Sequence, residues 1–100
     1  MDKLDIDPVK QEIISETSKI AWQELQYFFA SGKAVYVSEK LDLVEVASCF
    51  ANDNKVMVEN WMNNKQIMLV ENDQARNWYD NDAIVWAVVV KPWVLVQPIV

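Results

Sequence analysis

The residue types in this 100-residue chain exclude several chemistries before any fold is considered. The chain has no histidine and one cysteine, Cys49, so a Ser-His-Asp triad, a Cys-His pair and a zinc site of His and Cys ligands are excluded. Its single glycine, Gly32, cannot supply a Gly-rich loop that binds nucleotide phosphates. Cys49 itself lies in an apolar run that is typical of a small core residue. We therefore predict no catalytic, cofactor-binding or metal-ligating residues, and no cofactor.

Fifteen carboxylates nevertheless leave room for acid–base chemistry or a magnesium site. The local clusters are Asp53 with Glu59, Glu71 with Asp73, and the Asp80–Asp82 turn. Each cluster lies at a predicted helix cap or turn, where Asp is expected because its side chain accepts hydrogen bonds from nearby backbone N–H groups. A carboxylate- or magnesium-dependent enzyme is therefore the weakest of the function hypotheses.

Five tryptophans are the most unusual positive feature of the composition. Trp22 lies at the margin of an apolar helical stripe, and Trp93 follows a proline near the end of the chain. A tryptophan beside apolar residues on a surface is a common anchor at protein interfaces. We predict that Trp22, Phe29 and Trp93 bind a partner. The other three tryptophans fall on predicted inward faces and are interpreted as core residues: Trp61, Trp78 and Trp86.

The stretch Ala83–Val96, AIVWAVVVKPWVLV, is the segment that the remaining elements must cover. Residues of both parities are apolar, which is the pattern of a strand buried on both faces. Pro92 interrupts strand pairing, so residues 93–97 form either a bent continuation or a second, edge strand.

The N-terminal part of the chain predicts one long helix. Asp7 is suited to cap it, Pro8 to occupy its first turn, and Gly32 to follow its end near Ala30. Its apolar residues spread over roughly 220°, which is more than one small core requires. The excess indicates a second contact surface, unless Trp22 merely lies at the edge of the core stripe.

The middle of the chain predicts alternating short elements. We expect strands over residues 34–37 and 67–70, and a turn of helix over residues 74–79 that is capped by Asp73. Two helices, over residues 43–51 and 55–64, are separated by the polar break Asn52-Asp53-Asn54 and resemble a helix-turn-helix. The predicted class is therefore α+β, with a long N-terminal helix, this helix pair and a small sheet in the winged-helix order. A small parallel or mixed α/β sheet is the alternative.

Composition and charge suit one globular domain over residues 1–100, with 52% hydrophobic and 24% charged residues. The net charge of -6 opposes binding to nucleic acid and to anionic membranes. The acidic N-terminus lacks the features of a signal peptide, and Lys91 and Pro92 interrupt the apolar C-terminal stretch that could be mistaken for a membrane span. We predict a cytoplasmic protein.

Three pieces of the sequence resemble a known family: LDLVEVA at residues 41–47, the tryptophan at Trp61, and VVVKPWVLVQ at residues 88–97. The chain is similar here to a group of short bacterial proteins that is classed only as a domain of unknown function. The resemblance implies a bacterial source and a stand-alone domain. It implies no activity and no site residues.

The leading function hypothesis is a non-enzymatic protein-interaction or regulatory module that self-associates as a homodimer. One chain of this length readily forms two layers, whereas the Ala83–Val96 strand needs cover on both faces, so the partner is a second copy or another protein. The alternative is a DNA-binding winged-helix regulator. Its recognition helix, over residues 55–65, would carry two lysines around Glu59, few for binding DNA phosphates.

Overall fold

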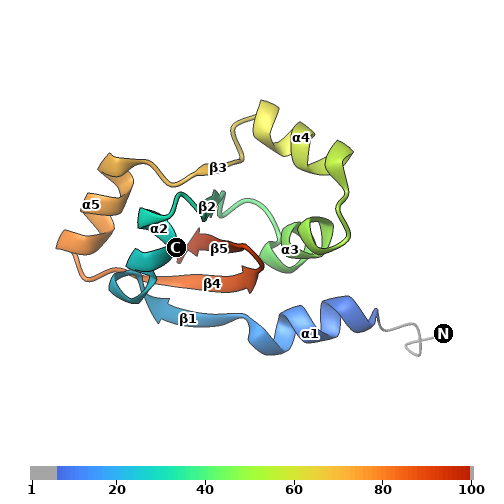
Figure 1. The fold of residues 1–100 in the computed structure, drawn as a ribbon, viewed down its shortest axis with the longest axis horizontal. Helices are drawn as coiled ribbons and strands as arrows, with labels where there is room; N and C mark the ends of the chain where they lie inside the picture. Colours follow the sequence, from blue (N-terminus) through green and yellow to red (C-terminus); the bar gives the residue numbers. More distant parts are fainter. Residues whose placement is uncertain (1–6, 100) are drawn as a thin grey trace.

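The structure, a computed structural model, describes residues 7–99, which form a five-stranded sheet with helices packed on both of its faces (Figure 1). The elements in chain order are α1 (Pro8–Glu16), β1 (Ser18–Ala21), the 3₁₀ helix η2 (Trp22–Leu25), α2 (Gln26–Ala30), β2 (Ala34–Val37), α3 (Leu43–Ala51), α4 (Lys55–Asn63), β3 (Ile67–Leu69), α5 (Asn72–Asp80), β4 (Ile84–Val90) and β5 (Trp93–Pro98).

The sheet is mixed, with the strand order β1-β4-β5-β2-β3. β2 and β5 pair in parallel, and the other neighbouring strands are antiparallel. The α+β class is therefore confirmed, with a mixed sheet. β4 and β5 form a hairpin whose last pair is Val90 and Trp93, so Pro92 lies in the turn and removes no ladder hydrogen bond. The expected edge strand after Pro92 is wrong, because β5 is the central strand of the sheet.

The predicted long helix from Pro8 to Ala30 is also wrong, although Asp7 caps its start as expected. α1 ends at Glu16, and the next residue, Thr17, is extended, with its hydroxyl donating to the carbonyl of Ile13 at 2.6 Å. A β-branched residue that bonds in this way competes with the helix. β1 then pairs with β4, and this long-range pairing overrides the local helical pattern.

In the middle of the chain the observed elements agree closely with the predicted ones. β2 and α3 have the predicted bounds, and Asp42 and Asn54 cap α3 and α4 through hydrogen bonds from backbone N–H groups. Gly32 follows α2 with φ of 71°, the left-handed conformation that glycine adopts readily. α5 begins earlier than expected, at Asn72, so Asp73 lies in its first turn rather than at its cap.

Helices cover both faces of the sheet in two groups, which lie toward opposite sides of the view in Figure 1. η2, α2 and α5 pack on one face, around Trp22 and Trp78, and α1, α3 and α4 pack on the other, around Val46 and Leu95. One protomer therefore covers most of both flanks of the Ala83–Val96 segment, contrary to expectation, although Ile84 and Val89 stay 50% and 41% exposed.

The winged-helix resemblance is not shown. α3 and α4 are consecutive helices, and β4 and β5 form a hairpin, as that resemblance requires. The sheet nevertheless has five strands, a parallel β2–β5 pair and helices on both faces. Between residues 7 and 99, no helix is both long and apolar enough to cross a membrane.

Candidate functional site

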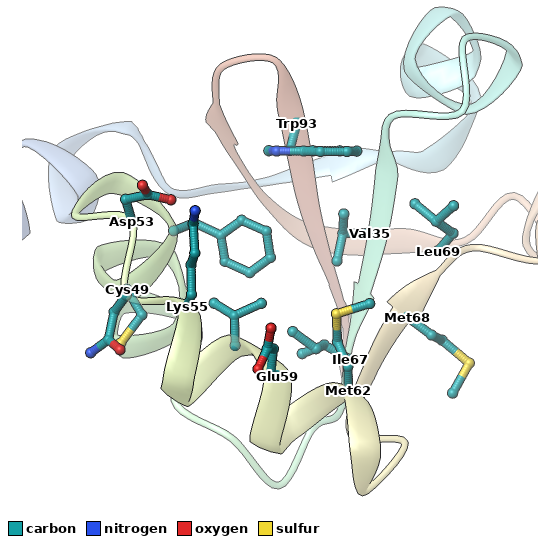
Figure 2. A pocket seen from close by; sticks show the side chains of 13 residues that line it. Val35, Cys49, Asp53, Lys55, Glu59, Met62, Ile67, Met68, Leu69 and Trp93 are labelled. Carbon is teal, nitrogen blue, oxygen red and sulfur yellow. The ribbon is translucent and has the colours of Figure 1, made fainter.

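A groove of about 450 Å³ opens between α4, β3 and the start of β5 (Figure 2). We call it the α4–β3 groove. The sheet contributes Val35, Ile67 and Leu69, and α4 contributes Val58 and Met62. The indole of Trp93 lies at one end of the groove, and Met68 points away from it (Figure 2). The groove therefore presents mainly apolar side chains to a ligand.

The groove stays open because α4 lies over the edge of the sheet. α3, which packs nearer the centre, fully buries Val46 and Ala47, whereas no residue of α4 is buried. Met62 of α4 and Leu69 of β3 are 53% and 51% exposed. Among residues 7–99 no sheet surface lies beyond the edge strand β3 against which these side chains could pack. The result is a pair of large apolar side chains facing solvent on either side of a hollow.

Charged residues line the groove at the beginning of α4. Asp53, Lys55 and Glu59 contribute to the lining, so the two carboxylates that the sequence had paired line the same groove, but they lie apart in it (Figure 2). Asn54 caps α4 by accepting a hydrogen bond from the Met57 N–H at 3.2 Å. Among residues 7–99 no group of three or more Asp, Glu or Cys side chains is placed to hold a metal ion. These residues add charge to the lining of a mainly apolar groove.

Cys49 also borders the groove. Its side chain is buried, and its thiol donates to Oε2 of Glu45 at a long 4.0 Å. Burial raises the pKa of the Cys49 thiol, and the charge of Glu45 raises it further. A raised pKa lowers the fraction of nucleophilic thiolate. The interpretation of Cys49 as a small core residue agrees with this geometry.

The outer side of β3 is an open strand edge. The carbonyl of Gln66 accepts a hydrogen bond from the Ser38 N–H at 2.8 Å, and the N–H of Val70 donates to the carbonyl of Ala34 at 2.9 Å, so both residues turn their main-chain groups toward β2. Met68, midway between them and paired with Tyr36, does the same. Because antiparallel bonds alternate, the N–H and C=O groups of Ile67 and Leu69 point away from β2. No further strand lies on that side within residues 7–99. The open edge therefore runs directly beside the groove.

The predicted partner-binding residues lie apart. Trp22 is fully buried, in edge contact with Trp78 at 5.0 Å between ring centroids, so its predicted exposure is wrong. Phe29 is half-buried against the same core and also contacts Trp22. Only Trp93 lines the groove, where Lys33 Nζ lies 5.7 Å from its ring centroid.

Sequence reasoning missed Met62 and Leu69. Met62 lies in the helix predicted over residues 55–64 and Leu69 in the strand predicted over residues 67–70, and neither was predicted to be exposed at a site. The signal that could have identified Leu69 is the shortness of its strand, since a three-residue strand is typical of a sheet edge.

These features define a small α+β domain with an apolar groove at one edge of a mixed sheet. The chain belongs to the family described as Protein of unknown function (DUF2288), which it matches over residues 8–98. It is also similar to a protein solved by NMR in solution, PA1075 from Pseudomonas aeruginosa, with 36% sequence identity and a TM-score of 0.82. That match covers 100% of this chain and 93% of the other. No match was found among curated proteins.

Proposed function

We propose that the protein is a non-enzymatic protein-interaction module that binds an extended apolar segment of a partner along β3. The observation that carries the proposal is the position of the α4–β3 groove beside the open strand edge. An added strand gains main-chain hydrogen bonds from the edge, and alternate side chains of that strand enter pockets beside it. The outward-pointing main-chain groups of Ile67 and Leu69 supply the hydrogen bonds, and the groove supplies a pocket for side chains.

The opposite face of β3 offers a second, smaller hollow. It has a volume of about 100 Å³ and is lined by Tyr36, Met68 and Gln74. Side chains of a bound strand alternate between the two faces of a sheet, so one set would meet the groove and the other this hollow. The other sheet edge, β1, exposes Ser18 and Lys19, and a lysine on an edge strand discourages pairing. β3 is therefore the better edge for a partner.

No specific observation favours the two alternative functions. For DNA binding, α4 places Glu59 beside Lys55, and the chain carries a net charge of -6, which opposes phosphate binding. For carboxylate chemistry, the candidate residues Asp53 and Glu59 line an apolar groove with one lysine and without a third acidic ligand.

The proposal is tested by titrating the labelled protein with short peptides of alternating apolar and uncharged polar residues, followed by NMR. We expect saturable shifts at the amides of Ile67 and Leu69 and at the indole of Trp93, and none at the indole of Trp22. Peptides that leave these signals unchanged, or that shift the Trp22 indole instead, would contradict the proposal.

A pair of variants on α4 makes the titration specific. Met62→Lys places a charge in the groove and should weaken peptide binding about tenfold or more, because the bound peptide would lose the apolar surface of Met62 that it covers. Val56→Lys is the matched control, since Val56 is 69% exposed on the same helix and does not line the groove. Equal loss in both variants would place the binding surface elsewhere.

A further inference from the structure

The sequence around β3 is complementary to itself in charge. The segment Lys65–Glu71 reads KQIMLVE, with a lysine at one end, a glutamate at the other and Met68 in the centre. If two copies pair antiparallel about Met68, Ile67 of each lies opposite Leu69 of the other. Lys65, in the turn before β3 with φ of 59°, and Glu71, the N-cap residue of α5, lie just beyond the paired residues, so that Lys65 of each copy is at the same end as Glu71 of the other. Opposite charges on facing positions of an antiparallel pair stabilise it. Both end residues are exposed in the structure, so both are available to a partner.

The backbone selects the same alignment independently. Residues that exchange N–H···O=C bonds across an antiparallel pair must both point their main-chain groups toward the partner strand. In β3 these residues are Ile67 and Leu69, which lie opposite each other when Met68 faces its own copy.

The helices next to β3 pack on opposite faces of the sheet. α4 precedes β3 and packs on one face of the sheet through Val58 and Trp61, whereas α5 follows β3 and packs on the other face through Ala75 and Trp78. A two-fold axis perpendicular to the sheet at Met68 sets the start of β3 in one copy beside the end of β3 in the other. At each end of the joined strands, α4 of one copy is therefore next to α5 of the other. The two helices then lie on opposite faces of the joined sheet.

From these observations we propose that the partner that β3 accepts is a second copy of this chain, docked antiparallel through Ile67 and Leu69. The inference rests on the proposed function, because it uses the same strand edge and names its occupant. The joined edges merge two five-stranded sheets into one and cover Leu69, which is 51% exposed in the single chain. Such closed two-fold pairing is the commonest form of self-association.

Charge reversal tests the alignment by sedimentation equilibrium of the full chain up to high micromolar concentration. Lys65→Glu alone, or Glu71→Lys alone, sets like charges opposite each other twice in the homodimer, and each should weaken dimerisation about tenfold. An equimolar mixture of the two variants restores opposite charges at both positions and should dimerise at least as strongly as the unmodified chain. Circular dichroism confirms that each variant is folded.

Matched controls separate this interface from general charge effects. Lys91→Glu and Glu24→Lys change the net charge by the same amounts at exposed positions away from β3, and should leave the dimerisation constant within about twofold. A dimer that responds equally to the control and the test variants, or a mixture that fails to re-associate, would overturn the proposed alignment. A strictly monomeric chain would overturn self-docking, while peptide binding in the groove would still support the module itself.

Discussion

Trp22 on one face of the sheet is fully buried, whereas Trp93 on the other face borders an open groove. Around Trp22 the cover is complete, because η2, α2 and α5 bring Phe29 and Trp78 into edge contact with its ring. Near Trp93, α4 buries none of its residues and leaves a hollow of about 450 Å³. The face around Trp22 is therefore closed at its centre, with only a smaller hollow beside Met68 at the β3 edge, whereas the Trp93 face is open over the larger α4–β3 groove.

The difference shows how a small domain can divide stability and binding between two faces. The closed face includes even a polar atom without a partner, since the indole N–H of Trp22 is buried and makes no hydrogen bond among the described residues. Leaving a donor unpaired is unfavourable, so the packing of the surrounding aromatic rings must outweigh it. The open face keeps apolar side chains exposed, which is unfavourable for a monomer and useful for a partner.

The largest expected effect is the removal of the Trp22 side chain. Trp22→Ala should lower the free energy of unfolding by about 3–5 kcal/mol, because it leaves a cavity in a fully packed core. Trp22→Phe keeps an aromatic ring and removes the unpaired N–H, so it should lose less. Urea denaturation followed by circular dichroism measures both. If Trp22→Ala lowered the free energy of unfolding by less than Trp93→Ala, the comparison of the two faces would be reversed.

Trp93→Ala should have a smaller effect on stability and a larger one on binding. Its ring is only half-buried, so we expect a loss of about 1–2 kcal/mol in the free energy of unfolding. The same change removes one end of the α4–β3 groove and should weaken peptide binding. The NMR titration described above checks this, with the indole of Trp22 as an internal reference. Unchanged peptide affinity would show that the end of the groove near Trp93 is not used.

The smallest expected effect belongs to the ion pair that joins α1 and α3 on the open face. Lys10 Nζ lies 2.7 Å from Oε1 of Glu45, but both side chains are substantially exposed. The hydrogen bond to Glu45 and its charge raise the pKa of Lys10. Stabilisation from a raised lysine pKa is present below the ordinary value of 10.5 and is lost as pH rises through the pKa in the folded chain.

Lys10→Gln should therefore lower the melting temperature only slightly at neutral pH, and the difference should shrink with added salt and above pH 10.5. Differential scanning calorimetry across pH measures it. A difference as large as that of Trp93→Ala would show that the pair organises the open face, contrary to its exposure.

Local signals in the sequence were sufficient for the elements that depend on neighbouring residues. α3 was predicted with its observed bounds because Asp42 supplies a cap and the apolar residues that follow recur at helical spacing. The N-terminal helix was not, because the helical pattern through residues 18–21 competes with pairing to β4, which is distant in the sequence. The same long-range pairing placed Trp22 at the start of η2 and turned a predicted surface residue into a core residue.

The candidate site was predicted only in part. Trp93 was identified by its position after Pro92, but the exposure of Met62 and Leu69 depends on where α4 and β3 fall relative to the edge of the sheet. Strand order is set by which strands meet in space and leaves no periodic signal in a single sequence. Apolar runs at the centre and at the edge of a sheet therefore look alike until the fold is known.

The amino-acid sequence by itself determined the lack of histidine and of a Gly-rich loop, the capped helices and the strongly apolar Ala83–Val96 segment, because each of these depends on residue types or on neighbours a few positions apart. The tertiary structure alone decided that both faces of the sheet are covered within one chain, that Trp22 is internal and that β3 ends the sheet. Those outcomes depend on pairing between distant segments, where the gain from burying shared surface outweighs local preference.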